Sequence, residues 1–257
     1  MSWTRRYDGP EPQRVNKWLA QAGVCSRREA EALIADGLVS IDGERIADAG
    51  RKILPGQTLV LAEAATAQLE QALTAVVHKP PGIVSAHPKP GQVEAARLLT
   101  AANLVGEGSA PPEDASLPPL GRLDLDSRGL LLLSQDGVLA KALIGPDSEV
   151  EKEYRVRVSG ELTERKVALL RHGLRLDGKP LKRARVDVKG EGRLRFVLTE
   201  GRNRQIRRMC EQVELRVVDL FRVRIGDLRL GDLPEGRWRA LTAEERADLL
   251  QPSGTRR

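Results

Sequence analysis

The chain has 257 residues, of which 40% are hydrophobic and 30% charged, so it is long enough to bury a core and does not have the composition of a disordered protein. Its net charge of +6 and pI near 9.6 fit a polyanionic partner, although a basic soluble protein without such a partner accounts for the charge equally well. Its first residues lack the apolar run of a secretory signal, and no run of about 18 apolar residues occurs, so we expect no membrane contact and a cytoplasmic location.

Cysteine use favours a reducing compartment. Only two cysteines occur, Cys25 and Cys210, and neither has a Cys or His nearby at metal-ligand spacing. We expect both to be buried thiols. Because the sequence also lacks a dinucleotide-binding fingerprint, we expect no metal and no dissociable cofactor.

The chain is predicted to contain two domains between two tails. Residues 1–13 and 251–257 are polar and charged, and we interpret them as tails, the first flexible and basic. Residues 14–61 are predicted to form a small domain and residues 73–250 a large one. Residues 62–72 between them are rich in Ala and Gln without strong periodicity, so we interpret them as a linker.

Local signals within residues 14–61 predict two helices and a hairpin. Helices are expected at 15–22 and 27–35. Ser26 and Glu29 have the spacing of a capping box, in which each side chain accepts a backbone N–H of the other residue. Asp42-Gly43, between two short β-favouring runs, predicts a tight hairpin turn.

Residues 73–250 alternate between strand-like and helical stretches. The strand-like runs are LTAVVHKP, GLLLLS, YRVRVSG, RLRFVLTE and VVDLFRVRIG, and the helical ones are VEAARLLTAAN, VLAKALIG, ERKVALLRHG and NRQIRRMCEQV. Short turns between neighbouring strands favour an α+β domain built on a mixed, largely antiparallel sheet flanked by helices. Residues 106–119 are predicted to form a Gly/Pro/Ser-rich loop directly before the sequence GRLD.

Three segments carry candidate chemistry: KPPGIVS from Lys79, GRLDLDSRGLLLLSQDG from Gly121 and EGRNRQIRRMCE from Glu200. Alone, the second segment reads as strand, loop and strand, with both of its early aspartates capping turns. Placed on a helix, the third has a core-facing stripe of Ile206, Met209, Cys210 and Val213. Its opposite side, which can contact phosphate, pair with a carboxylate or face solvent, carries Arg204, Arg207, Arg208 and Glu211.

Taken together in this order, the segments resemble the pseudouridine synthase family, in the branch that acts on ribosomal RNA and carries a small N-terminal RNA-binding domain. The motifs KPPG, GRLDxDSxGLLLL, KEY and GRNRQIRRMCE carry the resemblance, which covers residues 14–248. Residues 14–61 resemble the α-L RNA-binding domain, also found in a small-subunit ribosomal protein and in tyrosyl-tRNA synthetases. The ending QIRRMCE favours the members that modify large-subunit RNA.

The resemblance implies an isomerase that converts a chosen uridine to pseudouridine. It assigns the nucleophile to Asp124 and leaves Asp126 in the turn. An aspartate is ionised at neutral pH and therefore attacks carbon without a general base. Arg207 matches an arginine beside the catalytic carboxylate, and Tyr154 matches a tyrosine whose ring packs against the target uracil.

Further residues are expected to hold the RNA. Arg122 matches a position that helps displace the target base, and Lys79 is interpreted as part of the KPPG turn beside the cleft. The substrate-binding candidates are Arg122, Lys79, Arg202, Arg204 and Arg208. In the small domain, phosphate and shape contacts are expected from Arg14, Lys17, Arg27, Arg28 and Arg45.

The implied mechanism begins with extrusion of the uridine from its stack, which costs on the order of a few kcal/mol. Asp124 then attacks C1′ of the ribose or C6 of the base, or assists formation of a glycal. The glycosidic bond breaks, the uracil turns and rejoins through C5, and the C5 proton leaves to Tyr154 or water. We expect ribosomal RNA as the partner, naked or in an assembling particle, and a monomeric enzyme.

Two other functions are kept open. A catalytically inactive ribosome assembly factor would bind RNA without isomerising it, and the presence of Asp124, Tyr154 and Arg207 counts against it. A hydrolase of glycosides would use Asp124 and Asp126 as paired carboxylates, provided that they have the separation that such chemistry requires.

The chain departs from the family pattern in two places. Related enzymes often carry a glycine in the turn after the arginine-rich helix, where this chain reads QVELRVVDL. The loop at 106–119 is also extended, and we expect it to affect the choice of substrate.

Overall fold

The computed structural model describes residues 2–251 and divides the chain into two compact units. The first contains the residues up to Thr74 together with Ser134–Lys141, and the second contains Ala75–Leu133 together with the residues from Ala142 onward. No helix in the described part of the chain is long and apolar enough to cross a membrane. The tail expected at 251–257 lies outside the described residues, except for Gln251.

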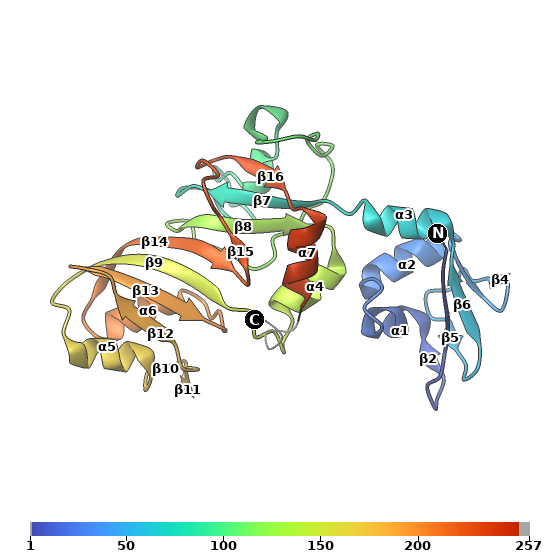
Figure 1. Ribbon diagram of the computed structural model, residues 1–257, viewed down its shortest axis with the longest axis horizontal. Coiled ribbons are helices and arrows are strands. Elements are labelled where there is room, and N and C mark those ends of the chain that lie inside the picture. The colour runs from blue at the N-terminus through green and yellow to red at the C-terminus, as the bar shows by residue number, and fades with distance from the viewer. Residues whose placement is uncertain (1, 252–257) are drawn as a thin grey trace. The chain divides into compact units, whose positions relative to one another are not determined.

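The first unit combines short helices with a four-stranded sheet of order β1-β6-β3-β4 (Figure 1). Its elements are β1 (Trp3–Arg6), β2 (Gln13–Arg14), α1 (Val15–Gln21), α2 (Arg27–Ala35), β3 (Val39–Ile41), β4 (Glu44–Arg45), β5 (Lys52–Ile53), β6 (Thr58–Leu61) and α3 (Glu63–Glu70). One apolar core joins the helices to the sheet, with Leu19, Ile34 and Leu59 all fully buried.

The local signals of this unit are confirmed. The Ser26 hydroxyl accepts the Glu29 N–H at 3.2 Å and the Glu29 carboxylate accepts the Ser26 N–H at 2.6 Å, so the capping box opens α2. Asp42 and Gly43 both have positive φ, 49° and 87°, and connect β3 to β4 as the hairpin turn requires.

The prediction of a flexible tail at residues 1–13 is wrong. Within it, β1 pairs with β6 in antiparallel register from Trp3 opposite Leu61 onward. Tyr7 is buried, and its ring meets Trp18 edge-on at 5.3 Å between centroids. Polar composition suggested disorder, but the aromatic residues of this segment bury their rings on α1, and β6 supplies the strand partner.

The prediction of a linker at residues 62–72 is also wrong for most of its length, because α3 occupies it. Ala, Glu, Gln and Leu all have high helix propensity, which compensates for the weak periodicity. Ala65 is fully buried and Leu69 packs against the same core, so the helix belongs to the first unit.

The second unit is built on a mixed sheet of order β12-β13-β9-β14-β8-β7-β16 (Figure 1). Strand β14 pairs in parallel with β8 and antiparallel with β9, which also pairs antiparallel with β13. The elements from Thr74 onward are β7 (Thr74–Lys79), η1 (Ala95–Leu98), η2 (Ala101–Asn103), β8 (Arg128–Ser134), α4 (Gly137–Ile144), β9 (Lys152–Ser159), α5 (Glu164–Arg171), β10 (Arg175–Leu176), β11 (Lys179–Pro180), β12 (Arg185–Val188), β13 (Arg193–Leu198), α6 (Gln205–Gln212), β14 (Arg216–Ile225), β15 (Leu228–Arg229), β16 (Trp238–Ala240) and α7 (Ala243–Leu250). Most of α4 belongs to the first unit.

Helices α5 and α6 cover one face of strands β12, β13, β9 and β14 and form a core with it. The stripe predicted for α6 is confirmed, because the four residues that it names are all buried: Ile206, Met209, Cys210 and Val213. Both thiols are buried as expected, and burial raises the pKa of Cys25 and of Cys210 to about 12.

The helix expected from VEAARLLTAAN is instead two short 3-10 turns, η1 and η2. Carbonyl groups of this segment bond to strand β16 and its surroundings. The Thr100 carbonyl accepts the Trp238 indole N–H at 2.8 Å, and the Ala102 carbonyl accepts from Arg237. These tertiary hydrogen bonds replace the i to i+4 ladder that an α-helix would need.

In the turn where related enzymes often carry glycine, Glu214 adopts a left-handed φ of 57°. That conformation destabilises the folded state by about 1–2 kcal/mol when the residue is not glycine. Replacement by glycine relieves this strain, but it also stabilises the unfolded state by about 0.5–1 kcal/mol, because glycine has more conformational freedom there. We therefore expect Glu214→Gly to raise the free energy of unfolding by about 0.5 kcal/mol in urea denaturation. Glu211→Gly, in α6, should lower it by about 1 kcal/mol, and equal effects of the two changes would contradict the assignment of strain.

Candidate active site

A polar cleft of about 600 Å³ opens in the second unit. It is lined by the GRLD loop, the segment after α4, the start of β9, the approach to α6 and the middle of β14. The charged and aromatic residues along it are Arg122, Asp124, Lys152, Tyr154, Lys182, Glu200, Arg202, Arg204 and Arg222. Two of the three motifs, GRLDLDS and EGRNRQIRRMCE, thus contribute residues directly to one site.

Asp124 lies in this cleft on a loop that the KPPGIVS segment holds from both sides. The buried Ser85 hydroxyl donates to the Leu123 carbonyl at 2.7 Å and accepts the Leu123 N–H at 2.9 Å. On the other side of Asp124, the Gly82 N–H donates to the Leu125 carbonyl at 2.8 Å. The KPPGIVS segment therefore fixes the backbone on each side of the aspartate.

Removal of the Ser85 hydroxyl should loosen this loop. In Ser85→Ala both backbone groups of Leu123 lose a buried partner, so the free energy of unfolding should fall by about 1–3 kcal/mol. Displacement of Asp124 by about 1 Å should lower the single-turnover rate of pseudouridine formation by roughly 100-fold. Denaturation and rate measurements on one preparation test both effects, and a parental rate in a destabilised variant would contradict the positioning role.

Two guanidinium groups approach Asp124. Arg207 Nε lies 3.8 Å and Arg204 Nη1 lies 3.7 Å from Asp124 Oδ2. The nearly buried Arg207 also donates to the Asp126 carbonyl at 3.0 Å and to the Ser127 hydroxyl at 3.1 Å, and pairs with Asp126 Oδ1 at 3.1 Å. Its Nε has no hydrogen-bond partner among the described residues. Arg207 thus holds the turn beyond Asp124 and keeps one donor directed toward the cleft carboxylate.

Arg204 occupies the N-cap of α6 with a left-handed φ of 48°. This conformation is unfavourable for arginine, and strain of this kind concentrates at functional sites. Its guanidinium lies 3.4 Å from Asp126 Oδ1 as well as near Asp124. Asp126 therefore pairs with both arginines, although it does not line the cleft.

Tyr154 and Lys152 line the cleft from strand β9, where residues two apart share a face. Tyr154 is partly buried against the core beneath the cleft. Lys152 donates to the Val150 carbonyl at 3.1 Å. Burial, with a smaller contribution from Arg222, lowers the pKa of Lys152 to about 8.

The lowered pKa predicts that RNA binding weakens above neutral pH. As the pH rises from 7 to 9, the Lys152 ammonium loses its charge and one phosphate attraction disappears, so KM for RNA should rise by roughly tenfold. Arginine stays charged in this range, and Lys152→Arg should therefore remove most of the rise. Steady-state kinetics across the range test this, and a flat KM for the parent would contradict it.

Sequence reasoning missed Arg222. This buried residue donates through Nε to the Leu130 carbonyl at 2.7 Å and lies against the Arg122 carbonyl at 3.5 Å. Its Nη2 has no partner among the described residues, although the residue lines the cleft. Strand β14 carries several charged residues, so its sequence does not single out Arg222, and only the strand pairing shows that this arginine faces the site. Lys152 is the first residue of the KEY motif, but sequence reasoning did not choose it as a site residue.

Three of the expected substrate-binding residues serve structural contacts. Lys79 is fully buried and donates to the carbonyls of its own KPPG turn, at 2.8 and 2.6 Å. Arg208 forms a bidentate pair with Asp177, outside the cleft. Arg202 lines the rim, but it donates to Glu200 and to three carbonyls of the β10–β11 hairpin. Arg122 is exposed at the rim.

The five basic residues expected to contact RNA in the first unit are all exposed: Arg14, Lys17, Arg27, Arg28 and Arg45. They lie on or beside β2, α1, α2 and β4. Exposure leaves these charges available to phosphate, since no ion pair within the described residues holds them.

A carboxylate, guanidinium groups and a tyrosine lie around one cleft in a basic chain, an arrangement that fits an enzyme acting on RNA. Residues 74–212 match the family model described as RNA pseudouridylate synthase, and residues 13–59 match the S4 domain. The chain belongs to the RNA pseudouridylate synthase family and is an RNA pseudouridine synthase. The resemblance and the α+β fold class, with its small N-terminal domain, are confirmed.

Similar proteins cover nearly the whole chain. The Dual-specificity RNA pseudouridine synthase RluF of Escherichia coli (strain K12) is 34% identical over 242 residues, which are 93% of this chain and 78% of that protein. An uncharacterized RNA pseudouridine synthase of Mycobacterium tuberculosis is 34% identical over 253 residues, 95% of this chain and 96% of that protein. The crystal structure of a pseudouridylate synthase matches with a TM-score of 0.64 and 26% identity, over 92% of this chain and 99% of that one.

Proposed function

We propose that this enzyme isomerises uridine in ribosomal RNA, in the RNA of the large subunit, with Asp124 as the nucleophile. The observation that carries the proposal is the position of Asp124, whose partly exposed side chain lies in the same cleft as Tyr154 and within 3.8 Å of two arginines. The neighbouring guanidinium groups hold the carboxylate in the orientation that attack on carbon requires.

The reaction balances without any outside reactant. Asp124 attacks C1′ or C6, or assists a glycal, and the N1–C1′ bond breaks. The uracil turns within the cleft, C5 forms a bond to C1′, the C5 proton leaves to Tyr154 or to water, and N1, released from the sugar, takes up a proton. The aspartate is released unchanged. The ring of Tyr154 packs on the uracil, and Arg122, at the rim, helps to displace the base from its stack.

The remaining cations hold the RNA and the loop. Arg204 and Arg207 keep the carboxylate in place, and the open Nη2 of Arg222 is available to an oxygen of the nucleotide in the cleft. The basic residues of the first unit grip a folded RNA element through phosphates and shape, which supplies affinity and placement. We propose that the enzyme acts as a monomer in the cytoplasm, on RNA that is naked or in an assembling particle.

The glycoside hydrolase alternative is disfavoured by the same geometry. Hydrolysis of that kind needs two carboxylates that face one bond. Asp126 pairs with Arg204 and Arg207 and does not line the cleft. The other carboxylate of the cleft, Glu200, is engaged by Arg202 at 3.2 Å and by Gln205 at 3.0 Å, so neither residue is a free partner for Asp124. The inactive assembly factor is disfavoured because Asp124, Tyr154 and the arginines are all in place.

The function is tested by incubating the purified protein with ribosomal RNA from a strain that lacks it. Chemical mapping of pseudouridine should then reveal new modification in large-subunit RNA. Modification confined to small-subunit RNA would correct the substrate, and RNA binding without any modification would favour the inactive factor.

A further inference from the structure

The face of the sheet that lies opposite the α5 and α6 core is rich in arginine. Along β9, Val156 and Val158 are buried in that core, whereas Arg155 and Arg157, which alternate with them, are exposed. Residues directly opposite each other on paired strands share a face. Arg193 of β13 lies opposite Arg157, so it belongs to the exposed face as well.

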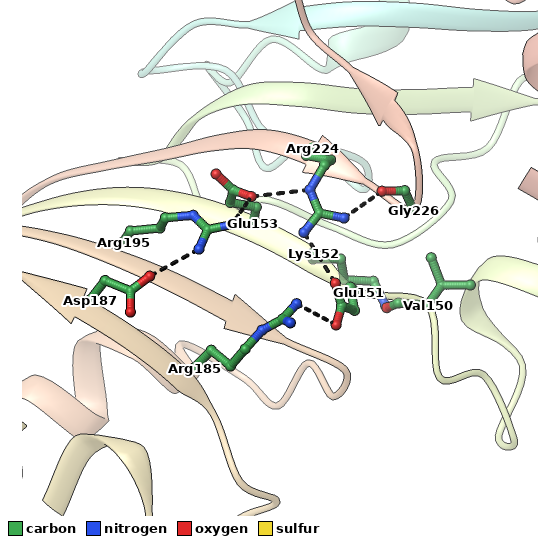
Figure 2. Close-up of polar contacts among 9 residues, drawn as sticks. All are labelled: Val150, Glu151, Lys152, Glu153, Arg185, Asp187, Arg195, Arg224 and Gly226. Atoms are coloured by element: carbon green, nitrogen blue, oxygen red, sulfur yellow. Dashed lines mark hydrogen bonds and ion pairs between the residues drawn. The ribbon is translucent and has the colours of Figure 1, made fainter. Parts of the chain in front are cut away.

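Acidic residues neutralise the arginines at one end of this face (Figure 2). Glu153 accepts from Arg195 at 2.9 Å and from Arg224 at 3.1 Å, and these guanidinium groups lower its pKa to about 2. Asp187 and Glu151 complete the network, with contacts of 2.9 Å to Arg195, 3.2 Å to Arg224 and 2.6 Å to Arg185. Three arginines at this end are thus matched by three carboxylates.

The other end has no such balance. Arg155, Arg193 and Arg216 are exposed, and no ion pair within the described residues holds them. Arg157 lies near Asp219, but that carboxylate is already engaged by Arg128 through two hydrogen bonds of 3.0 and 2.9 Å. Arginine opposite arginine across β9 and β13 is unfavourable for the sheet itself. This surplus of positive charge would be neutralised by a bound anion.

We propose that this arginine face, formed by Arg155, Arg157, Arg193 and Arg216, binds the sugar-phosphate backbone of a second segment of the RNA substrate. The cleft and the arginine face lie on opposite sides of β9, because Tyr154 points into the cleft and its neighbour Arg155 points away. The proposal adds a surface to the function proposed above, on which it rests.

The chemistry of the face favours RNA over an acidic protein. Guanidinium groups bind phosphate in a bidentate manner, and a row of them follows a backbone whose charges repeat regularly. A protein interface would need an apolar or aromatic centre. Phe221, the aromatic residue opposite Arg155, is partly buried with the Arg128 guanidinium 4.0 Å above its ring.

The test measures the affinity of the full chain for an unmodified transcript of large-subunit ribosomal RNA at several salt concentrations. The slope of log affinity against log salt should fall by about two in Arg155→Gln/Arg193→Gln, one unit for each phosphate that is no longer neutralised. The affinity at about 0.1 M salt should fall by roughly tenfold or more. The matched control, Arg165→Gln/Arg175→Gln, removes two exposed arginines from α5 and β10 and should keep the parental slope.

The variant Arg155→Lys/Arg193→Lys should restore most of the slope, since lysine keeps the charge. The proposal is overturned if the glutamine variant matches its control. It is equally overturned if the lysine variant loses RNA affinity as the glutamine variant does. Binding to poly-glutamate is measured in parallel, and a glutamine variant that loses only this binding would also overturn the proposal, because it would indicate a surface for acidic proteins. Pseudouridine formation by the parent is measured on the same transcript, and a parent that binds without isomerising counts against the proposed function alone.

Discussion

Asp124→Asn should lower the rate of pseudouridine formation by about 10⁴-fold or more. The amide keeps the shape of the side chain but lacks the negative charge and nucleophilicity that the attack on C1′ or C6 requires, and loss of a nucleophile commonly has an effect of this size. The fold should be retained. The side chain of Asp124 is 28% exposed and its ion pairs are 3.7 and 3.8 Å long, so their loss should cost less than about 1 kcal/mol.

Asp126→Asn is the matched control. It removes the same charge two residues away and affects contacts of the same arginines, but Asp126 does not line the cleft. Its rate should fall by no more than roughly tenfold, through a small shift of the turn. Single-turnover rates on one RNA decide between the two residues. If Asp126→Asn were the more damaging change, the nucleophile would be misassigned.

Arg207→Met should lower the rate by roughly 100-fold or more and also destabilise the protein. The long apolar side chain retains much of the packing but leaves the Asp126 carbonyl and the Ser127 hydroxyl without their donor. Loss of these bonds should cost about 1–3 kcal/mol of unfolding free energy. The rate falls because the Asp124 loop is no longer fixed, and a displacement of about 1 Å is sufficient for a loss of this size.

Arg208→Met provides the comparison from the next position of α6. Arg208 pairs with Asp177 outside the cleft, so its replacement should leave the single-turnover rate within about threefold of the parent, as expected for an exposed ion pair. Rates are measured well below the unfolding temperature of each variant, so that unfolded protein does not contribute. A parental rate for Arg207→Met, or equal losses in the two variants, would contradict the role of Arg207.

Local signals in the sequence were sufficient to predict structures whose contacts all lie within one short segment. The Ser26–Glu29 capping box and the Asp42-Gly43 turn depend on residues at most three apart, and both occur as predicted. The buried stripe of α6 follows from helical periodicity alone. The motifs also placed Asp124 and Tyr154 in one cleft, through the family resemblance.

Elements that depend on distant partners could not be predicted in this way. Strand β1 exists because β6, more than fifty residues later, pairs with it. The segment after Val93 does not form an α-helix, because Trp238 and Arg237 donate hydrogen bonds to its carbonyl groups. Arg208 was assigned to the substrate because periodicity gives the side of a helix but does not reveal a partner such as Asp177.

Several residues of the cleft could not be predicted for the same reason. Ser85 holds the Asp124 loop from 38 residues away in the chain, and Arg222 reaches the cleft from strand β14, whose other arginines do not line it. Lys79 was counted with the substrate, yet its ammonium is buried in its own turn. Burial of a charged group is set by tertiary packing, which no single segment encodes.

The most direct test of the central claim uses RNA that carries tritium at C5 of uridine. Rejoining the base through C5 must expel the hydrogen of that carbon, so the parent should release one tritium into water for each pseudouridine formed, and Asp124→Asn should release almost none. Release of free uracil with its label intact, or tritium release that survives in Asp124→Asn, would contradict an isomerisation that depends on this carboxylate.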